Sequence, residues 1–221
     1  MQKRRLLKYY GLIAFVSVAL AIGLNNIILI SGVANYSKAY QEAAEMLYAP
    51  SFGMQILFTG IVIPIIEELL FRGLAFRILR KWIPFVWAMI ATALLFGVYH
   101  GNLVQFIYAT LCGLFLAYLC EKFQTVLAPI TAHIVMNITA CTMTELQWFS
   151  WMFGNVWRVI VVTMICAFIF GMVFWFLQKM DVTKMLKNHC KDITLFFNTM
   201  HLFVKFNIKN VIMVNFNGFI V

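Results

Sequence analysis

The sequence is poor in charge and has no long polar segment. Only 11% of its 221 residues are charged, whereas 63% are hydrophobic, and the mean hydropathy is +0.89. Soluble domains carry about 25% charged residues, so the composition excludes an ordinary soluble domain. The sequence also has no internal repeat and no linker rich in proline, glycine and serine. This favours one membrane domain.

Two metal-binding patterns are also missing. The five cysteines form no C-x-x-C pair, and four of them fall in or at the end of apolar segments. They are best interpreted as small packing residues. The H-E-x-x-H arrangement of many zinc proteases is absent as well.

Apolar segments of membrane-spanning length dominate the chain. We predict an all-α polytopic helical bundle of about six transmembrane helices within a membrane domain at residues 1–180. The predicted spans are Tyr10–Ala34, Ser51–Leu79, Pro84–Tyr99, Leu103–Leu119, Val126–Met143 and Val156–Leu177. Residues 181–221 form a basic and apolar C-terminal tail whose structure the sequence does not indicate.

Lysine and arginine predict the orientation, since short loops rich in them stay in the cytoplasm. They precede the first span and follow the second, fourth and sixth, which predicts cytoplasmic termini. The net charge of +9 is thus mainly a topology signal, with attraction to anionic lipid as a by-product. Nucleic acid is not an expected partner, because these residues are dispersed. The long first span predicts an uncleaved anchor.

Three charged residues interrupt the second span: Glu67, Glu68 and Arg72. An Asp, Lys or Arg at the centre of a membrane helix costs roughly 2.5–3.5 kcal/mol, so such residues usually face a protein interior or a water-filled cavity. Glu68 and Arg72 are four residues apart and share a helix face, which predicts an ion pair. Glu67 points about 100° away and is left for another partner. A purely structural role, stapling two helices, is the alternative.

Two further polar groups lie in later spans. Phe96 to His100 reads F-G-V-Y-H, and His133 to Asn137 reads H-I-V-M-N, which places His133 and Asn137 on one helix face. Each histidine taken alone is more typical of a hydrogen-bonded core residue. A carboxylate, two histidines and an asparagine converging on one cavity would indicate hydrolysis.

In these three motifs the chain resembles the prokaryotic CPBP family of intramembrane proteases, which is related to the CAAX prenyl endopeptidases and also called Abi. The family patterns E-E-x-x-x-R, F-x-x-x-H and H-x-x-x-N match Glu67–Arg72, Phe96–His100 and His133–Asn137 in order. The resemblance covers roughly residues 50–140. It implies a four-helix catalytic core.

The resemblance implies a role for each site residue. Glu67 would be the general base that activates water, and His100 would help to hold that water. His133 and Asn137 would stabilise the oxyanion, with Glu68 and Arg72 as supports. A partly desolvated carboxylate suits base chemistry, and donors aimed in advance at the oxyanion suit its stabilisation.

The cofactor remains open at this stage. Glu67, His100 and His133 would also make a three-ligand zinc site with water in the fourth position. The same residues can work without a metal, so we expect either no cofactor or zinc.

The expected function is an intramembrane endopeptidase of a bacterial plasma membrane. It would cut a membrane-associated peptide or protein, with bacteriocin immunity or peptide maturation as its context. One alternative is a non-catalytic immunity protein that binds its target and retains the protease scaffold. Another is an ion or metal transporter, although we find neither repeated halves nor paired broken helices. The sequence does not indicate an oligomeric state.

Overall fold

The structure is a computed structural model that describes residues 2–180, with side chains from residue 7 onward. The predicted tail, residues 181–221, lies outside the described residues.

Every regular element in the described part is helical, which confirms the predicted all-α polytopic bundle. Five helices are long and apolar enough to cross a membrane. They are α1 (Gln2–Ile30), the continuous helix Phe52–Leu79, α7 (Leu103–Phe123), α8 (Leu127–Glu145) and α10 (Val156–Lys179). The third predicted span forms α6 (Phe85–Tyr99), a shorter apolar helix of 15 residues.

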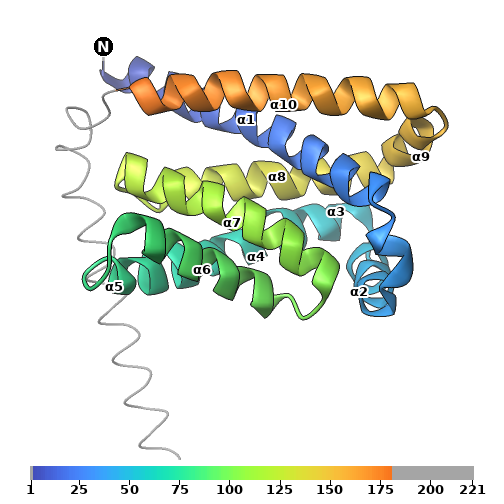
Figure 1. Ribbon diagram of the computed structural model, residues 1–221, viewed down its shortest axis with the longest axis horizontal. Helices are drawn as coiled ribbons and strands as arrows, with labels where there is room; N and C mark the ends of the chain where they lie inside the picture. The colour runs from blue at the N-terminus through green and yellow to red at the C-terminus, as the bar shows by residue number, and fades with distance from the viewer. Residues whose placement is uncertain (1, 181–221) are drawn as a thin grey trace, which may run out of the picture. The chain divides into compact units, whose positions relative to one another are not determined.

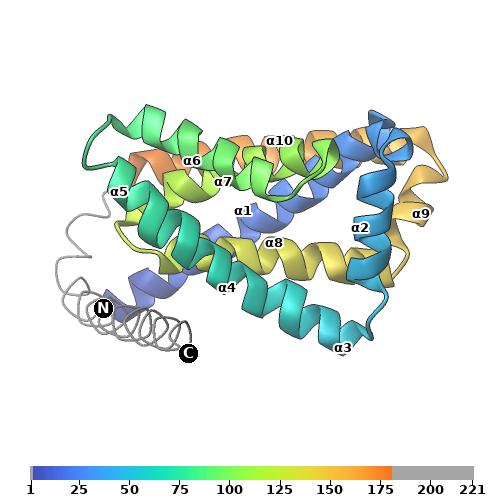
Figure 2. The same cartoon turned by 90° about the horizontal axis from the view of Figure 1, so that it is seen from below.

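The helices lie in layers around α7 and α8 (Figure 1). On one side, α1 packs against both α8 and α10; on the other, α6 packs against α7, and the Phe52–Leu79 helix packs against α8. The short elements η1 (Val33–Tyr36), α2 (Lys38–Tyr48) and α9 (Trp148–Phe153) lie at one end of the bundle, as a second view confirms (Figure 2). The most exposed long helix is α10, whose large apolar side chains face outward.

The Phe52–Leu79 helix is not a regular α-helix along its length. It runs through α3 (Phe52–Met54), the π-helical segment η2 (Gln55–Val62), α4 (Ile63–Glu68), the π-helical segment η3 (Leu69–Phe76) and α5 (Arg77–Leu79). Wide turns of this kind are rare and occur frequently at functional sites. Here they flank the six-residue segment that carries both site carboxylates.

A tight corner joins α6 to α7. Gly101 adopts a left-handed backbone conformation with φ of 74°, which glycine tolerates without strain. Asn102 then caps α7: its Oδ1 accepts the backbone N–H of Gln105 at 2.9 Å, and its Nδ2 donates to the Gln105 side chain. This reciprocal capping fixes the start of α7 directly after His100.

Gly97 makes the close contact between α6 and α7 possible. A Cβ atom at this position would overlap Thr110 Oγ1 and lie 2.8 Å from the carbonyl oxygen of Phe106. The backbone of the facing helix cannot move aside easily, so any side chain must push the two helices apart.

We therefore expect Gly97→Ala to destabilise the protein by about 1–3 kcal/mol, the usual cost of overpacking. Thermal unfolding in detergent measures this. Gly171→Ala is the matched control, since a Cβ there meets nothing within 4 Å, and it should change stability by less than about 0.5 kcal/mol. Equal unfolding midpoints for the two variants would contradict the close contact.

Basic residues gather at the end of the bundle opposite α2 and α9. Lys122 Nζ donates to the carbonyl oxygen of Gln178 at 2.9 Å, which places a cation at the C-terminal end of α10. Arg80 forms a two-contact ion pair with Glu121, its shorter contact being 2.8 Å. The start of α1 lies at this end too (Figure 1).

Candidate active site

A buried ion pair forms the base of the site. Arg72 Nη1 donates to Glu68 Oε1 at 2.8 Å, and both side chains are fully buried. The pairing predicted from the four-residue spacing is therefore confirmed. Arg72 Nη2 donates at 3.0 Å to the carbonyl oxygen of Gly113 on α7. A Cβ at Gly113 would lie 3.1 Å from this guanidinium nitrogen, so the absence of a side chain allows the contact.

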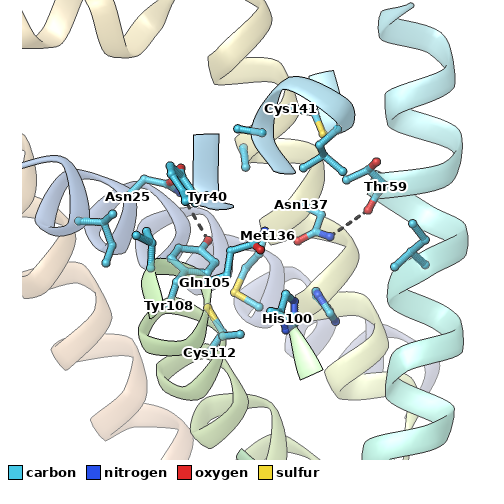
Figure 3. A pocket seen from close by; sticks show the side chains of 18 of the residues that line it. Asn25, Tyr40, Thr59, His100, Gln105, Tyr108, Cys112, Met136, Asn137 and Cys141 are labelled. Atoms are coloured by element: carbon cyan, nitrogen blue, oxygen red, sulfur yellow. Dashed lines mark hydrogen bonds between the residues drawn. The ribbon is translucent and has the colours of Figure 1, made fainter. Parts of the chain in front are cut away.

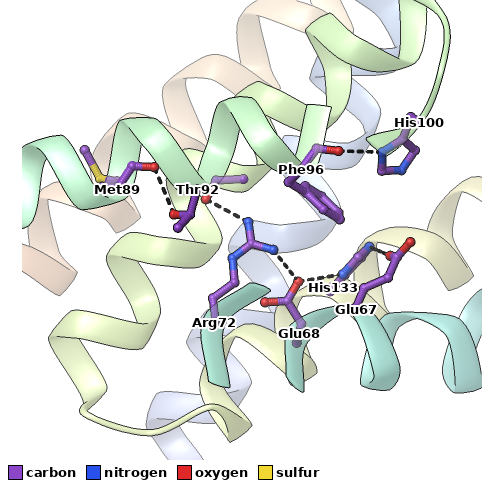
Figure 4. Close-up of polar contacts among 9 residues, drawn as sticks. Glu67, Glu68, Arg72, Met89, Thr92, Phe96, His100 and His133 are labelled. Carbon is purple, nitrogen blue, oxygen red and sulfur yellow. Dashed lines mark hydrogen bonds and ion pairs between the residues drawn. The ribbon is translucent and has the colours of Figure 1, made fainter. Parts of the chain in front are cut away.

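The same Glu68 oxygen has a second partner that the sequence did not reveal. His133 Nδ1 lies 2.9 Å from Glu68 Oε1 (Figure 4). Because this oxygen belongs to a carboxylate paired with Arg72, the histidine nitrogen is the donor. Glu68 thus connects its own helix to α8 and fixes the orientation of the imidazole ring.

Glu67 faces the other side of His133. His133 Nε2 lies 3.7 Å from Glu67 Oε2, and the Glu67 residue is 7% exposed. With Nδ1 donating to Glu68, Nε2 carries a hydrogen only when the ring is protonated. His133 therefore accepts a hydrogen bond at Nε2 as neutral imidazole and donates one as imidazolium.

His100 lies at the end of α6 with a fixed tautomer. Its Nδ1 lies 2.8 Å from the carbonyl oxygen of Phe96. A carbonyl oxygen only accepts, so Nδ1 carries the hydrogen and, in the neutral ring, Nε2 is left as an acceptor. Such an acceptor is able to take one hydrogen bond from a water molecule.

The Phe96 ring holds the polar side chains apart. The Arg72 guanidinium lies over it at 4.6 Å from the ring centroid. The rings of His100 and His133 meet it edge to face at centroid distances of 4.9 and 5.7 Å. The phenylalanine of the F-x-x-x-H motif therefore spaces the site and supplies a cation–π contact to the buried arginine.

Asn137 lies one turn along α8 from His133. Its Nδ2 donates at 2.9 Å to the carbonyl oxygen of Thr59, within the π-helical segment η2. One amide hydrogen is thereby used for orientation, and the second is left for another acceptor.

A cavity of about 250 Å³ brings the predicted residues together. Glu67, His100, His133 and Asn137 all line it, although they come from three helices. Its remaining walls are mostly apolar and come from α1, α2, α7 and α8 (Figure 3). A small, largely apolar cavity with a few converging polar groups is the usual form of a ligand site.

A zinc site would need Glu67, His100 and His133 to converge on one point. His133 Nε2 and Glu67 Oε2 lie 3.7 Å apart, and the Nδ1 atoms of both histidines are engaged by Phe96 and Glu68, which leaves only the two Nε2 atoms to bind a metal ion. However, within residues 2–180 no group of three His, Cys, Asp and Glu side chains is placed to hold a metal ion. The predicted set of Glu67, His100 and His133 therefore does not fit a three-ligand zinc site in this structure.

Several lining residues were missed by the sequence analysis. Asn25 on α1, Tyr40 and Tyr48 on α2, and Gln105 and Tyr108 on α7 all contribute to the cavity. Asn25 and Gln105, amides within predicted apolar spans, carried an available signal, whereas the tyrosines carried none.

Comparison with known proteins finds similarity in the segment that carries the three motifs. The family model described as Type II CAAX prenyl endopeptidase Rce1-like matches residues 49–139, a segment that includes all three motifs. The chain is also 29% identical over 106 residues to the "Putative membrane peptidase YdiL" of Bacillus subtilis (strain 168). That alignment covers 48% of this chain and 43% of the relative, so the similarity extends over less than half of either protein. No solved structure matches the chain. The resemblance predicted from the motifs is confirmed over this segment.

Proposed function

From the likeness of residues 49–139 to the Rce1-like endopeptidases, we propose that this chain is a glutamate-dependent intramembrane endopeptidase. The observation that carries the proposal is the cavity in which Glu67, His100, His133 and Asn137 converge. Its substrate would be a membrane-associated peptide or protein.

In this mechanism a water molecule binds between Glu67 and His100. The Glu67 carboxylate takes one proton of the water, while His100 Nε2 accepts a hydrogen bond from the other and orients it. The resulting hydroxide attacks the scissile carbonyl carbon, and the carbonyl oxygen becomes the oxyanion. General-base assistance of this kind contributes roughly 10²–10⁴-fold to the rate.

Donors on α8 would stabilise that oxyanion. Asn137 has one amide hydrogen left after its bond to Thr59. His133 in its protonated form would donate from Nε2, while its Nδ1 hydrogen stays on Glu68 and keeps the ring oriented. When the intermediate collapses, the C–N bond breaks and Glu67 returns its proton to the leaving nitrogen. A single well-aimed donor is worth about 10²–10³-fold in such reactions.

We propose a bacterial plasma membrane as the location, with both termini cytoplasmic. Basic residues at the end of the bundle that holds the start of α1 and the end of α10 support this orientation. Bacteriocin immunity and maturation of a secreted peptide are the two contexts we propose. Anionic lipid is the expected membrane partner.

The test is cleavage of a fluorogenic membrane-peptide library by purified protein in lipid vesicles, with and without a chelator. We expect cleavage that survives chelation, because the site residues do not fit a zinc-ligand set. Activity that disappears with chelator and returns with added zinc would replace the glutamate mechanism by a metal-dependent one.

If no library peptide is cut, immunity assays in cells decide between enzyme and binding protein. A protease requires its site, so Glu67→Ala and His133→Ala should each abolish protection. Protection retained by both variants would instead favour the non-catalytic immunity protein.

A further inference from the structure

The wall of the cavity built by α1 and α7 carries polar side chains that the proposed mechanism does not use. Asn25 lies in the C-terminal part of the apolar span Leu7–Ile30, where a polar group needs a partner. Its Nδ2 donates to the carbonyl oxygen of Ala21 at 2.8 Å and, more weakly, to the Tyr108 hydroxyl at 3.4 Å. Figure 3 shows Asn25 and Tyr108 on one side of the cavity and Thr59 on the other.

The other atom of the Asn25 amide is unused. Within residues 2–180, Asn25 Oδ1 accepts no hydrogen bond, and it lies on a residue that lines the cavity. The neighbouring Asn26 has a different role: it is fully buried and its Nδ2 donates to Thr163 on α10 at 3.1 Å. Adjacent asparagines therefore face in two directions, one toward a partner helix and one toward the cavity.

Gln105 on α7 offers the complementary group. Its Oε1 is held by Asn102 in the helix cap. Its Nε2 makes no hydrogen bond to any residue in the described part of the chain, although Gln105 lines the same cavity. One free acceptor and one free donor are thus presented by α1 and α7. A peptide group, with its own N–H and C=O, requires such a pair.

A peptide cut inside this cavity would need these partners. A scissile bond must leave any helical conformation before water can attack it, which frees the N–H and C=O groups of the residues beside it. In apolar surroundings each unpaired backbone group is costly. The walls are mostly apolar, and the polar groups nearest Glu67 are already used by the proposed mechanism.

We infer that Asn25 and Gln105 form a peptide-backbone subsite, which holds the extended substrate at a residue next to the scissile bond. This inference rests on the proposed function and deepens it, since it specifies an unwound peptide segment as the bound form. Asn25 lies outside the matched residues 49–139, so its contribution belongs to this chain and not to the matched segment. Both are positioning residues, because neither touches the reacting atoms.

The test compares Asn25→Leu with Asn26→Leu, a control of the same residue type one position along the same helix. In lipid vesicles, Asn25→Leu should raise KM roughly tenfold with little change in kcat, the effect of losing one hydrogen bond to a bound peptide group. Asn26→Leu should leave both constants unchanged.

A binding measurement separates this inference from the proposed function. Affinity for a fluorescent membrane peptide is measured in the Glu67→Gln background, with and without Asn25→Leu, and a tenfold weakening supports the subsite. If the wild type cleaves but Asn25→Leu has an unchanged KM, the subsite is wrong and the protease stands. If the wild type never cleaves yet binding depends on Asn25, the protease is wrong and the subsite stands. Equal effects of Asn25→Leu and Asn26→Leu, or no peptide binding at all, overturn the subsite.

Discussion

Replacing Glu67 with glutamine is expected to lower peptide hydrolysis by about 10²–10⁴-fold, the usual contribution of a general base. Glutamine has nearly the same shape but cannot take a proton from water. Within the described residues, the one ion-pair contact of Glu67 is with His133 Nε2 at 3.7 Å, beyond hydrogen-bond distance. The substitution therefore removes the group that accepts a proton from water, but it removes no hydrogen bond that stabilises the fold.

Initial rates on the fluorogenic peptides, together with thermal unfolding of each sample, measure this effect. Glu121→Gln is the matched control, since Glu121 pairs with Arg80 outside the cavity, and it should leave the rate unchanged. A Glu67→Gln variant that retains activity within about threefold of the wild type would show that another group activates the water.

Replacing Arg72 with methionine is expected to destabilise the protein by about 3–5 kcal/mol, the cost of leaving a buried charge without its partner. Glu68 is fully buried, and its Oε2 has no hydrogen-bond partner in the described part of the chain. After the substitution, its remaining contact would be the hydrogen bond from His133.

A double variant distinguishes the ion pair from simple packing. Glu68→Leu combined with Arg72→Met removes both charges, and replacement of a buried pair by apolar residues is often neutral. We expect most of the lost stability to return, while activity stays low because His133 has lost the acceptor that orients its ring. If the double variant is as unstable as Arg72→Met alone, the loss comes from packing around Phe96 and not from charge.

The sequence predicted the local parts of this site better than the contacts between helices. Glu68 and Arg72 pair as expected, because their four-residue spacing fixes their relation on any helix. The corner after His100 is equally local, since the left-handed Gly101 and the capping Asn102 form it from adjacent residues. Such features depend only on neighbouring residues.

Contacts between helices could not be predicted from the sequence. The bond from His133 to Glu68 joins residues 65 positions apart, and two apolar helices can pack in many rotations that the pattern does not distinguish. A charged residue in an apolar span strongly indicates a functional site, whereas a single neutral amide indicates one only weakly. Asn25 was therefore not predicted as a site residue. Helix ends were also imprecise: α7 continues to Phe123 and not Leu119, because Lys122 lies favourably in its last turn.

The cluster around Glu68 also constrains how the protein is made. Glu68 and Arg72 come from the Phe52–Leu79 helix. The Gly113 carbonyl comes from α7, and His133 comes from α8. The first of these helices leaves the ribosome before its partners do. Until they arrive, its charged side chains each oppose insertion by roughly 2.5–3.5 kcal/mol. We therefore expect the helix to become more stable in the bilayer as α7 and α8 join it, in the same step that orients the His133 ring.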